Sequence, residues 1–291
     1  MLLKGKNIAI TGAGRGIGKS VAIAYAKEGA NLGLIARTAE QLEETKKEIE
    51  ALGTDVKVVI QTADVTKFNE LENAFKNIEA EIGLLSGVVA NAGYSSKAVS
   101  HEMDSEKFAY VMDVNVNGVF NTFKAAYPHL AMDDKKNKAQ FLITGSAAYP
   151  NAMRKFAAYT ASKWAIVGLQ KSLSTEYKKE NINFNMILPT MVDTWLLRRD
   201  KAGDGNKPPT VMETDELDDY FVFFMTKKAN KLSDELADTN DLKQVEKIIA
   251  DASDDKKASW DVFKPYLKEV NEYVYKNLGK LRRIVEFLLE R

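Results

Sequence analysis

The sequence contains no cysteine and only two histidines, His101 and His129, among 291 residues. Without cysteine the chain has no disulfide framework, no thiol nucleophile and no thiolate ligand for zinc or an iron–sulfur cluster. The spacing of the two histidines fits no metal-binding motif, which argues against an imidazole-based metalloenzyme. We therefore predict no metal site.

Neither sign of charge is in excess, because 41 lysine and arginine residues balance 41 aspartate and glutamate residues. Nucleic-acid binders usually carry a basic excess, so no nucleic-acid partner is expected. No run of about 18 apolar residues occurs, which predicts no membrane span. Residues 1–6 lead into a strand-like segment without an apolar stretch of signal-peptide length, so the expected location is cytoplasmic.

Short apolar runs alternate with helix-periodic segments over the first 190 residues. The runs are Asn7–Thr11, Asn31–Ala36, Asp55–Gln61, Ser86–Ala90, Ala139–Thr144 and Asn183–Leu188. Between them lie helical patterns such as Thr38–Leu52, which opens with a Thr38…Gln41 capping box, and Lys67–Ile82. Repeated strand–helix–strand units build right-handed crossovers around a parallel sheet that is covered on both faces. The sequence predicts an α/β fold with a doubly wound, Rossmann-like sheet.

The pattern changes beyond about residue 200. Asp200–Thr210 contains two glycines and two prolines, and residues 194–212 are predicted to form a mobile substrate lid hinged near Gly203 and Gly205. Lys231–Leu236 is a poor candidate strand, so no seventh strand is expected after Met225.

From Asp241 to Arg291 the pattern is helical throughout. One apolar stripe is expected there, formed by Trp260, Phe263, Leu267, Val270, Val274, Leu278, Leu281, Val285 and Leu288. The predicted organisation is a Rossmann-like catalytic domain over residues 1–200, a lid region and helix over 201–240, and a helical C-terminal extension over 241–291. The extension is expected to pack on the same domain or on a partner subunit.

A glycine-rich loop follows the first expected strand and opens a helix over Lys19–Glu28. Its spacing is Gly-x-x-x-Gly-x-Gly, from Gly12, Gly16 and Gly18, because Ile17 occupies the position where the commoner dinucleotide motif has its last glycine. Such a loop lets the backbone approach a pyrophosphate at the N-terminus of a helix. The loop alone leaves open an ordinary strand–helix turn.

Two arginines distinguish between the possible dinucleotides. An NAD site usually has an acidic residue after the second strand, whereas this chain has Ala36-Arg37 and no acid before Glu40. Arg15 in the glycine loop supplies a second guanidinium, and two guanidiniums suit a 2′-phosphate. Either arginine alone would be interpreted as a solvated surface charge, but the pair favours NADP(H) over NAD(H).

Four polar residues are candidates for catalysis. Tyr159 and Lys163 lie four apart in an expected helix from about Phe156 to Lys178, which places a phenol and an ammonium group on one face. A nearby cation lowers the pKa of a phenol towards neutrality. Ser146 follows the fifth strand, and Asn115 lies within a helical pattern. Each residue alone is better explained as helix surface, cap or turn.

Together, and in this order, these motifs resemble the short-chain dehydrogenase/reductase family, in its single-domain, NADP(H)-type branch. Two further motifs match: an acid after the third strand, in Ala63-Asp64-Val65, and the intact Asn91-Ala92-Gly93. The resemblance covers about residues 4–195. The chain departs from the family's Pro-Gly at Leu188-Pro189-Thr190, although it keeps Thr194, and Val192 is expected to make main-chain contacts to the carboxamide.

The resemblance implies hydride transfer between a nicotinamide and a carbonyl or alcohol carbon. Tyr159 would exchange the proton, Lys163 would lower its pKa and hold the ribose, Ser146 would bind the substrate oxygen, and Asn115 would hold a water. The implied cofactor-binding residues are Gly12, Arg15, Gly16, Ile17, Gly18, Arg37, Asp64, Val65, Asn91, Ala92, Gly93, Tyr159, Lys163, Pro189, Val192 and Thr194.

The expected substrate is a hydrophobic small-molecule carbonyl or alcohol, because the candidate pocket residues are bulky and mostly apolar. They are Tyr149, Met153, Phe156, Met191, Trp195 and Leu196, each of which is alternatively explained by packing. Arg198 and Arg199 are adjacent on a helix and are predicted to form a solvated face rather than an anion site. A homo-oligomer is expected, without transferring the family's assembly rules.

Two classes of function remain open at this stage. The favoured one is an NADP(H)-dependent oxidoreductase, because the catalytic set is complete. The alternative is an NADP(H)-binding regulatory or scaffold protein that uses the helical extension for partner contacts. A nucleotide-sugar epimerase is a weaker third choice, since its glycine loop is usually shorter and its substrate domain larger.

Overall fold

A computed structural model describes residues 1–133, 137–257, 260–271 and 282–290. In this part of the chain, seven parallel strands form one sheet in the order β3-β2-β1-β4-β5-β6-β7. They are β1 (Asn7–Thr11), β2 (Asn31–Ala36), β3 (Val58–Thr62), β4 (Gly87–Ala90), β5 (Ala139–Thr144), β6 (Ile182–Leu188) and β7 (Glu235–Asp238). The order reverses between β1 and β4, where open parallel sheets bind their ligands. The predicted doubly wound α/β fold is confirmed.

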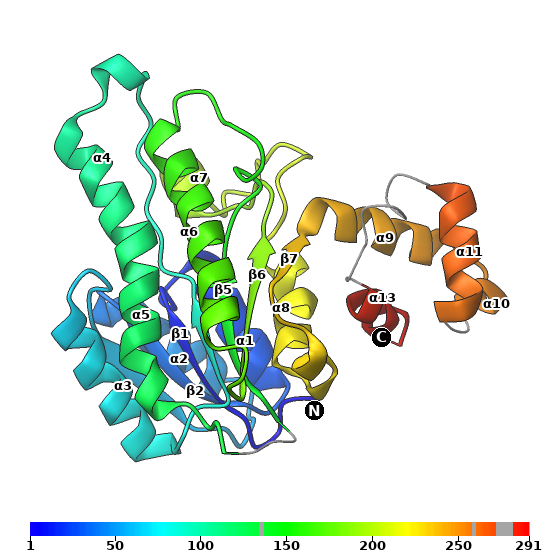
Figure 1. The fold of residues 1–291 in the computed structure, drawn as a ribbon, viewed down its shortest axis with the longest axis horizontal. Helices are drawn as coiled ribbons and strands as arrows, with labels where there is room; N and C mark the ends of the chain where they lie inside the picture. The colour runs from blue at the N-terminus through cyan, green and yellow to red at the C-terminus, as the bar shows by residue number, and fades with distance from the viewer. Residues whose placement is uncertain (134–136, 258–259, 272–281, 291) are drawn as a thin grey trace.

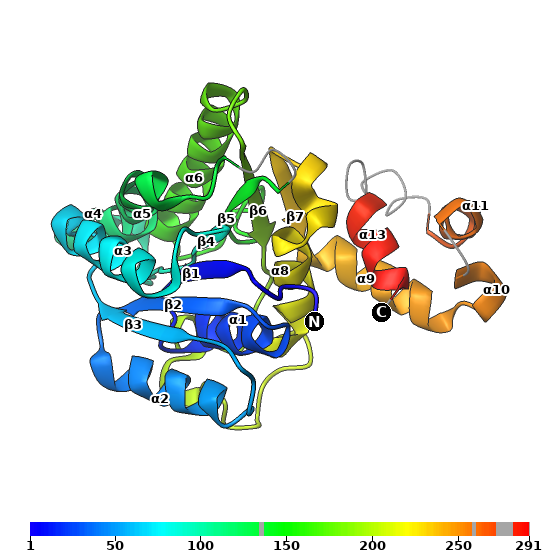
Figure 2. The same ribbon diagram turned by 90° about the horizontal axis from the view of Figure 1, so that it is seen from below.

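Helices cover both faces of the sheet (Figures 1 and 2). One face carries α1 (Gly16–Lys27), α2 (Ala39–Glu50) and α8 (Asp218–Met225); the other carries α3 (Phe68–Ile82), α4 (Ser105–Met112), α5 (Gly118–Ala126) and α6 (Ala157–Glu176). A buried apolar cluster lies between the sheet and each helical layer. Strands buried on both faces explain the near-continuous apolar runs of the sequence.

Single helical turns connect these elements: η1 (Ser100–Glu102), the π-helical η2 (Asp113–Asn117), η3 (Tyr127–His129), η4 (Arg199–Lys201), η5 (Asp215–Leu217) and η6 (Lys227–Lys231), together with the short helix α7 (Trp195–Arg198). The capping box predicted at Thr38 is absent, because the Thr38 side chain makes no capping hydrogen bond. Gln41 instead lies against the glycine loop, where a Cβ added to Gly14 would meet its Cβ at 2.8 Å.

A seventh strand is present, contrary to the sequence-based expectation. β7 pairs in parallel with β6, from Asn185↔Glu235 to Leu188↔Asp238. The strand sequence is weak, but the side chain of Asn185 fixes it by accepting from the Glu235 backbone N–H at 3.1 Å and donating to the Leu232 carbonyl at 3.0 Å. Asparagines at alternate positions of a buried strand were the signal for this pairing.

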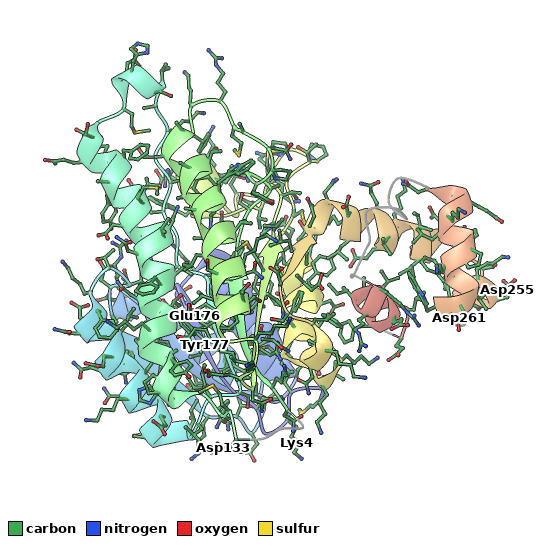
Figure 3. All side chains as sticks on the ribbon, in the orientation of Figure 1. Lys4, Asp133, Glu176, Tyr177, Asp255 and Asp261 are labelled. Atoms are coloured by element: carbon green, nitrogen blue, oxygen red, sulfur yellow. The ribbon has the colours of Figure 1, made fainter. Side chains whose placement is uncertain are left out.

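The C-terminal extension consists of separate helices: α9 (Thr239–Asp251), α10 (Asp254–Lys257), α11 (Trp260–Val270) and α13 (Arg282–Leu289). Phe263, Leu267 and Val285 of the predicted stripe are buried, and Trp260 and Leu288 are partly buried. Val270 is 52% exposed, so the stripe is wrong there. Val274, Leu278 and Leu281 lie outside the described residues. The extension projects from the β7 end of the sheet, with Asp255 and Asp261 far from the strands (Figures 1 and 3).

The extension nevertheless packs against α8. The rings of Phe287 and Phe223 meet edge to face with centroids 5.4 Å apart, and Lys228 forms an ion pair with Glu290. Phe287 belongs to the same buried cluster as α1 and α8. Within the described ranges, no helix has the length and apolar character that crossing a bilayer requires.

Candidate active site

The glycine loop is held tightly against the end of β4. Gly12 adopts φ +68°, and a Cβ there would lie 2.9 Å from Cα of Ala92. A Cβ on Gly18 would lie 2.3 Å from the Gly12 carbonyl oxygen. Helix α1 begins at Gly16, earlier than predicted. The first N–H groups of a helix have no partner within the helix, and here they belong to the glycine loop, around Ile17. This geometry, at the reversal of strand order, is typical of loops that bind anions.

The Asn91-Ala92-Gly93 motif supports this loop. The side-chain amide of Asn91 donates to the carbonyls of Thr11 at 3.1 Å and Gly12 at 3.3 Å. The backbone N–H groups of Asn91 and Ala92 donate to Oγ1 of Thr11 at 3.1 and 3.2 Å. The Asn91 side chain is therefore committed to shaping the loop, while Gly93 lies beside Asn115.

The structure brings Arg15 and Arg37 close to each other. Burial is the largest cause that lowers the pKa of Arg15, and repulsion from Arg37 and Arg199 adds to it. Arg37 lies 3.6 Å from the carboxylate of Asp64 and donates to the Tyr110 hydroxyl at 2.5 Å. The carbonyl of the adjacent Val65 accepts from Asn121 at 3.0 Å. Sequence analysis did not predict this contact of Tyr110.

Tyr159, Lys163 and Ser146 come together at the C-terminal end of β5. Tyr159 and Lys163 lie in the first two turns of α6, at the opposite end from Glu176 and Tyr177 (Figure 3). Ser146 lies close enough to Tyr159 to act on the pKa of its phenol, and Nζ of Lys163 lies 5.4 Å from the centroid of the Tyr159 ring. All three side chains are buried.

The pKa values in this cluster differ in part from expectation. Burial raises the pKa of Tyr159, and the hydrogen bond with Ser146 only opposes that effect. Burial lowers the pKa of Lys163 to about 8. The ammonium group donates to the Thr144 carbonyl at 2.9 Å, so its charge is directed at the end of β5 as well as towards the phenol. The net shift of the Tyr159 pKa in this structure is therefore upward, whereas a net lowering was expected from Lys163.

Asn115 lies in the π-helical turn η2, and its side chain ties two segments together. Its Oδ1 accepts from the Tyr94 backbone N–H at 2.8 Å, while Nδ2 donates to the Tyr94 carbonyl and to Oγ of Ser162, both at 2.9 Å. Ser162 donates in turn to the Tyr159 carbonyl at 2.7 Å. Both amide N–H groups of Asn115 are thus engaged. Ser162 was missed by the sequence analysis, although it lies one helical turn after Tyr159.

The segment after β6 packs over the glycine loop. The Pro189 carbonyl accepts from the backbone N–H of Ala147, next to Ser146, at 2.8 Å. Val192 is buried, and the methyl group of Thr194 lies 3.2 Å from where a Cβ on Gly16 would be. Pro189 therefore lies beside Ser146, and Thr194 lies beside the start of α1.

The predicted pocket residues divide into two groups. Phe156 adjoins Tyr159, with ring centroids 6.3 Å apart, and Tyr149 packs edge to face on Trp164. Trp195, by contrast, lies against two arginine side chains, and Leu196 lies near Gly93. Met191 is 44% exposed, and Met153 is partly buried. That these residues line a substrate pocket, and that the lid moves, stay predictions.

Comparison with known proteins gives concordant matches. A family model described as short chain dehydrogenase matches residues 6–204. The (-)-trans-carveol dehydrogenase of Rhodococcus erythropolis is 31% identical over 211 residues, covering 68% of this chain and 75% of that protein. The 2-(S)-hydroxypropyl-CoM dehydrogenase 3 of Xanthobacter autotrophicus is 33% identical, covering 71% and 79%. An Arabidopsis thaliana 3-dehydrosphinganine reductase is 30% identical, covering 66% of this chain but only 56% of its own length.

Solved structures show the same fold. A short-chain type dehydrogenase/reductase from Mycobacterium marinum matches with a TM-score of 0.71 at 29% identity, over 81% of this chain and 94% of that one. A 3-ketoacyl-(acyl-carrier-protein) reductase from Brucella melitensis, complexed with NADH, matches with a TM-score of 0.72 at 25% identity, over 81% and 97%. Since the family model alone matches more than half of the residues, the chain belongs to the short-chain dehydrogenase/reductase family and is an oxidoreductase of that family.

Proposed function

We propose that the protein is an NADP(H)-dependent oxidoreductase that reduces the carbonyl of a hydrophobic small molecule, or oxidises the matching secondary alcohol. One observation carries this proposal: the buried phenol of Tyr159 lies beside Ser146 and Lys163 at the carboxyl end of β5. The neighbouring strand ends carry the glycine loop and its anion site. An acid–base pair and a dinucleotide cradle on one sheet edge suit hydride transfer.

The residues present fit a dinucleotide. A Cβ at Gly12 or Gly18 would clash with the backbone, so the loop leaves room for a close approach to phosphate. Arg15 and Arg37 supply two guanidiniums near that loop, which supports a 2′-phosphate and hence NADP(H). When bound, the nicotinamide supplies or accepts the hydride. The Brucella melitensis reductase, solved in complex with NADH, supports a nicotinamide cofactor.

The proton step follows from the environment of Tyr159. Because burial raises its pKa, the phenol is protonated at neutral pH and is ready to act as an acid. In reduction, the carbonyl carbon gains the hydride and the carbonyl oxygen takes the Tyr159 proton, while Oγ of Ser146 hydrogen-bonds that oxygen. The phenolate left behind is favoured by the Lys163 ammonium and regains a proton from solvent. Oxidation of an alcohol runs through the same groups in reverse.

The substrate class is supported by the apolar surroundings of Tyr159 and by the relatives. Phe156 packs next to Tyr159, and Tyr149 follows Ser146 in the same loop. Carveol dehydrogenase and 3-dehydrosphinganine reductase are named for hydrophobic alcohols and ketones. We therefore propose apolar ketones and secondary alcohols as the first compounds to test.

The test follows the decay of NADPH, and separately of NADH, with a panel of hydrophobic ketones. We expect turnover that prefers NADPH and falls by about 10²–10⁴-fold in Tyr159→Phe, with NADPH binding retained. Tyr177→Phe is a matched control, since it makes the same change at the other end of α6 (Figure 3) and leaves activity unchanged. Failure of the wild-type protein to bind either cofactor would overturn the proposal. Bound NADPH that no substrate consumes would instead support the regulatory or scaffold alternative.

A further inference from the structure

Arg198 and Arg199 are neighbours in the lid with different surroundings. Arg198 is fully paired, because Nη1 donates to Asp193 at 2.9 Å and Nη2 donates to Asp204 at 2.8 Å. Arg199 points the other way and donates from Nη2 to the Ser95 carbonyl at 2.8 Å. The two side chains therefore do not form the solvated face that the sequence predicted.

The second amino group of Arg199 has no hydrogen-bond partner in the part of the chain that the structure describes. Its Nη1 is buried, and no acceptor among the described residues lies within hydrogen-bonding distance. The backbone of Arg199 has φ +56° and ψ −132°, a conformation that residues with a Cβ rarely adopt. A buried unsatisfied N–H and a strained backbone each cost free energy. Both costs fall on Arg199, and this points to a ligand that binds the Arg199 side chain.

The residues around Arg199 indicate the charge of that ligand. Cζ of Arg199 and Cζ of Arg15 each lie 4.3 Å from the centroid of the Trp195 ring. Neither arginine forms an ion pair with any residue in the described ranges, whereas Arg37 is paired with Asp64. The repulsion that Arg37 and Arg199 exert on Arg15 shows that the three guanidiniums share one region. Such a cluster favours an anion with several oxygen atoms, as a phosphate has.

The cluster of guanidinium groups lies near the glycine loop, where the dinucleotide is expected, and not near the residues that would contact the reacting carbonyl. Arg15 is in the glycine loop, and Thr194, which precedes α7, lies against Gly16 at the start of α1. Leu196 of the same helix lies next to Gly93. The contacts of Arg199 are thus with the cofactor-binding loops and not with Ser146 or Tyr159.

We propose that Arg199 binds a phosphate group of the dinucleotide cofactor, with Trp195 holding its guanidinium next to that of Arg15, so that the lid forms part of the cofactor site. The assignment rests on the proposed function, because it needs a dinucleotide to be bound. The phosphate is either the pyrophosphate or the 2′-phosphate, and the affinities for the two cofactors separate these sources.

The experiment measures the dissociation constants of NADPH and NADH by fluorescence for wild type, Arg199→Gln and Arg199→Lys. Loss of a charge-assisted hydrogen bond predicts about a tenfold or larger increase in Kd for Arg199→Gln. An increase in Kd for both cofactors would assign Arg199 to the pyrophosphate. An increase in Kd for NADPH alone would assign Arg199 to the 2′-phosphate. Arg199→Lys should recover part of the affinity, because it keeps the charge. Arg282→Gln, on the exposed surface of α13, is the matched control and leaves Kd unchanged.

A measurement on the wild-type protein covers the case in which Arg199→Gln fails to fold. Phenylglyoxal modification, mapped by mass spectrometry, should show Arg199 protected by NADPH and not by adenosine, which has no phosphate. Unprotected Arg199, or Kd values within twofold of wild type for a folded Arg199→Gln, would overturn the assignment. A raised KM for anionic substrates only, with cofactor affinity intact, would also overturn it. Wild-type protein that binds neither cofactor would overturn the proposed function itself, which distinguishes the two failures.

Discussion

The guanidinium of Arg37 is shared between two groups: it lies 3.6 Å from the carboxylate of Asp64 and donates to the Tyr110 hydroxyl at 2.5 Å. These contacts hold the side chain over the end of β2, on the side where Arg15 lies. They also place a carboxylate next to the guanidinium that we assign to the 2′-phosphate. A phosphate dianion has to compete with Asp64 for Arg37, and its greater charge favours it in that competition.

Replacing Arg37 by Gln should therefore change cofactor preference. We expect the Kd of NADPH to rise by about tenfold, since one charge-assisted contact is lost, while the Kd of NADH changes by less than about twofold. Fluorescence titration of both cofactors gives the two constants. Arg282→Gln removes a guanidinium with the same 55% side-chain exposure and should leave both unchanged. Equal losses for the two cofactors would exclude 2′-phosphate binding by Arg37.

The charge of Lys163 should set a limit on activity at alkaline pH. Burial lowers its pKa to about 8, so the ammonium form that favours the Tyr159 phenolate is present below pH 8 and is lost above it. We expect kcat/KM for ketone reduction to be level near pH 7 and to fall about tenfold per pH unit well above pH 8. The measurement is a pH profile at saturating NADPH. The control is Lys163→Arg, whose residual activity should lack this decline; a decline near pH 8 that persists in that variant would assign it to another group.

The sequence predicted those parts of the fold and site that depend on local pattern. The bounds of β1, β2 and β5 agree with prediction, because doubly buried strands have uninterrupted apolar runs. Tyr159, Lys163 and Ser146 meet because helix spacing and the parallel sheet bring them to one edge. Apolar runs were enough to place these strands, whereas the catalytic residues were identified by their order together in the chain.

The features that were missed depend on contacts between distant segments. β7 has a weak strand sequence and is fixed by the side chain of Asn185 on β6. The direction of the Tyr159 pKa shift depends on how completely the phenol is enclosed, which residue spacing does not reveal. Arg199 was predicted to face solvent as part of a helix, but α7 ends at Arg198, and the Arg199 backbone leaves helical geometry with φ +56°, with its side chain donating to Ser95.

The carboxyl group of Asp218 should make stability depend on pH. Burial raises its pKa to about 7, against the hydrogen bond that Oγ of Ser20 donates to it at 3.0 Å; Asp215 and Asp219 raise the pKa further and Lys27 lowers it. Since the pKa in the folded state lies above the ordinary value of 3.8, the protonated form favours folding. The resulting stability is present below about pH 4 and is lost as the pH rises through 7.

Asp218→Asn keeps a neutral group that still bonds to Ser20, so it should remove this dependence. Relative to wild type, we expect the variant to gain on the order of 2 kcal/mol in unfolding free energy between pH 5 and pH 8. Urea denaturation at the two pH values measures the change. Asp133→Asn, at an exposed loop position (Figure 3), is the control and should show no such trend. A constant difference between Asp218→Asn and wild type at both pH values would contradict the shifted pKa.

We propose that the C-terminal extension folds as one cooperative unit with the sheet, because Phe287 is only 3% exposed and packs on Phe223 of α8. Phe287→Ala should then lower the unfolding free energy by about 3 kcal/mol, as truncation of a buried phenylalanine does. The control is Val270→Ala, where the side chain is 52% exposed and the effect should stay below about 0.5 kcal/mol.

The tryptophans test whether the two regions unfold together. Trp260 lies in α11 of the extension, whereas Trp164 and Trp195 lie in α6 and α7. Two versions of the protein, one keeping only Trp260 and the other keeping only Trp164, report separately on the two regions during urea unfolding. If the regions are coupled, Phe287→Ala shifts both transitions by the same amount, because a single equilibrium governs both probes. A shift confined to the Trp260 signal would show that the extension is a separate unit that only rests on α8, and its function would then have to be sought in contacts outside the catalytic domain.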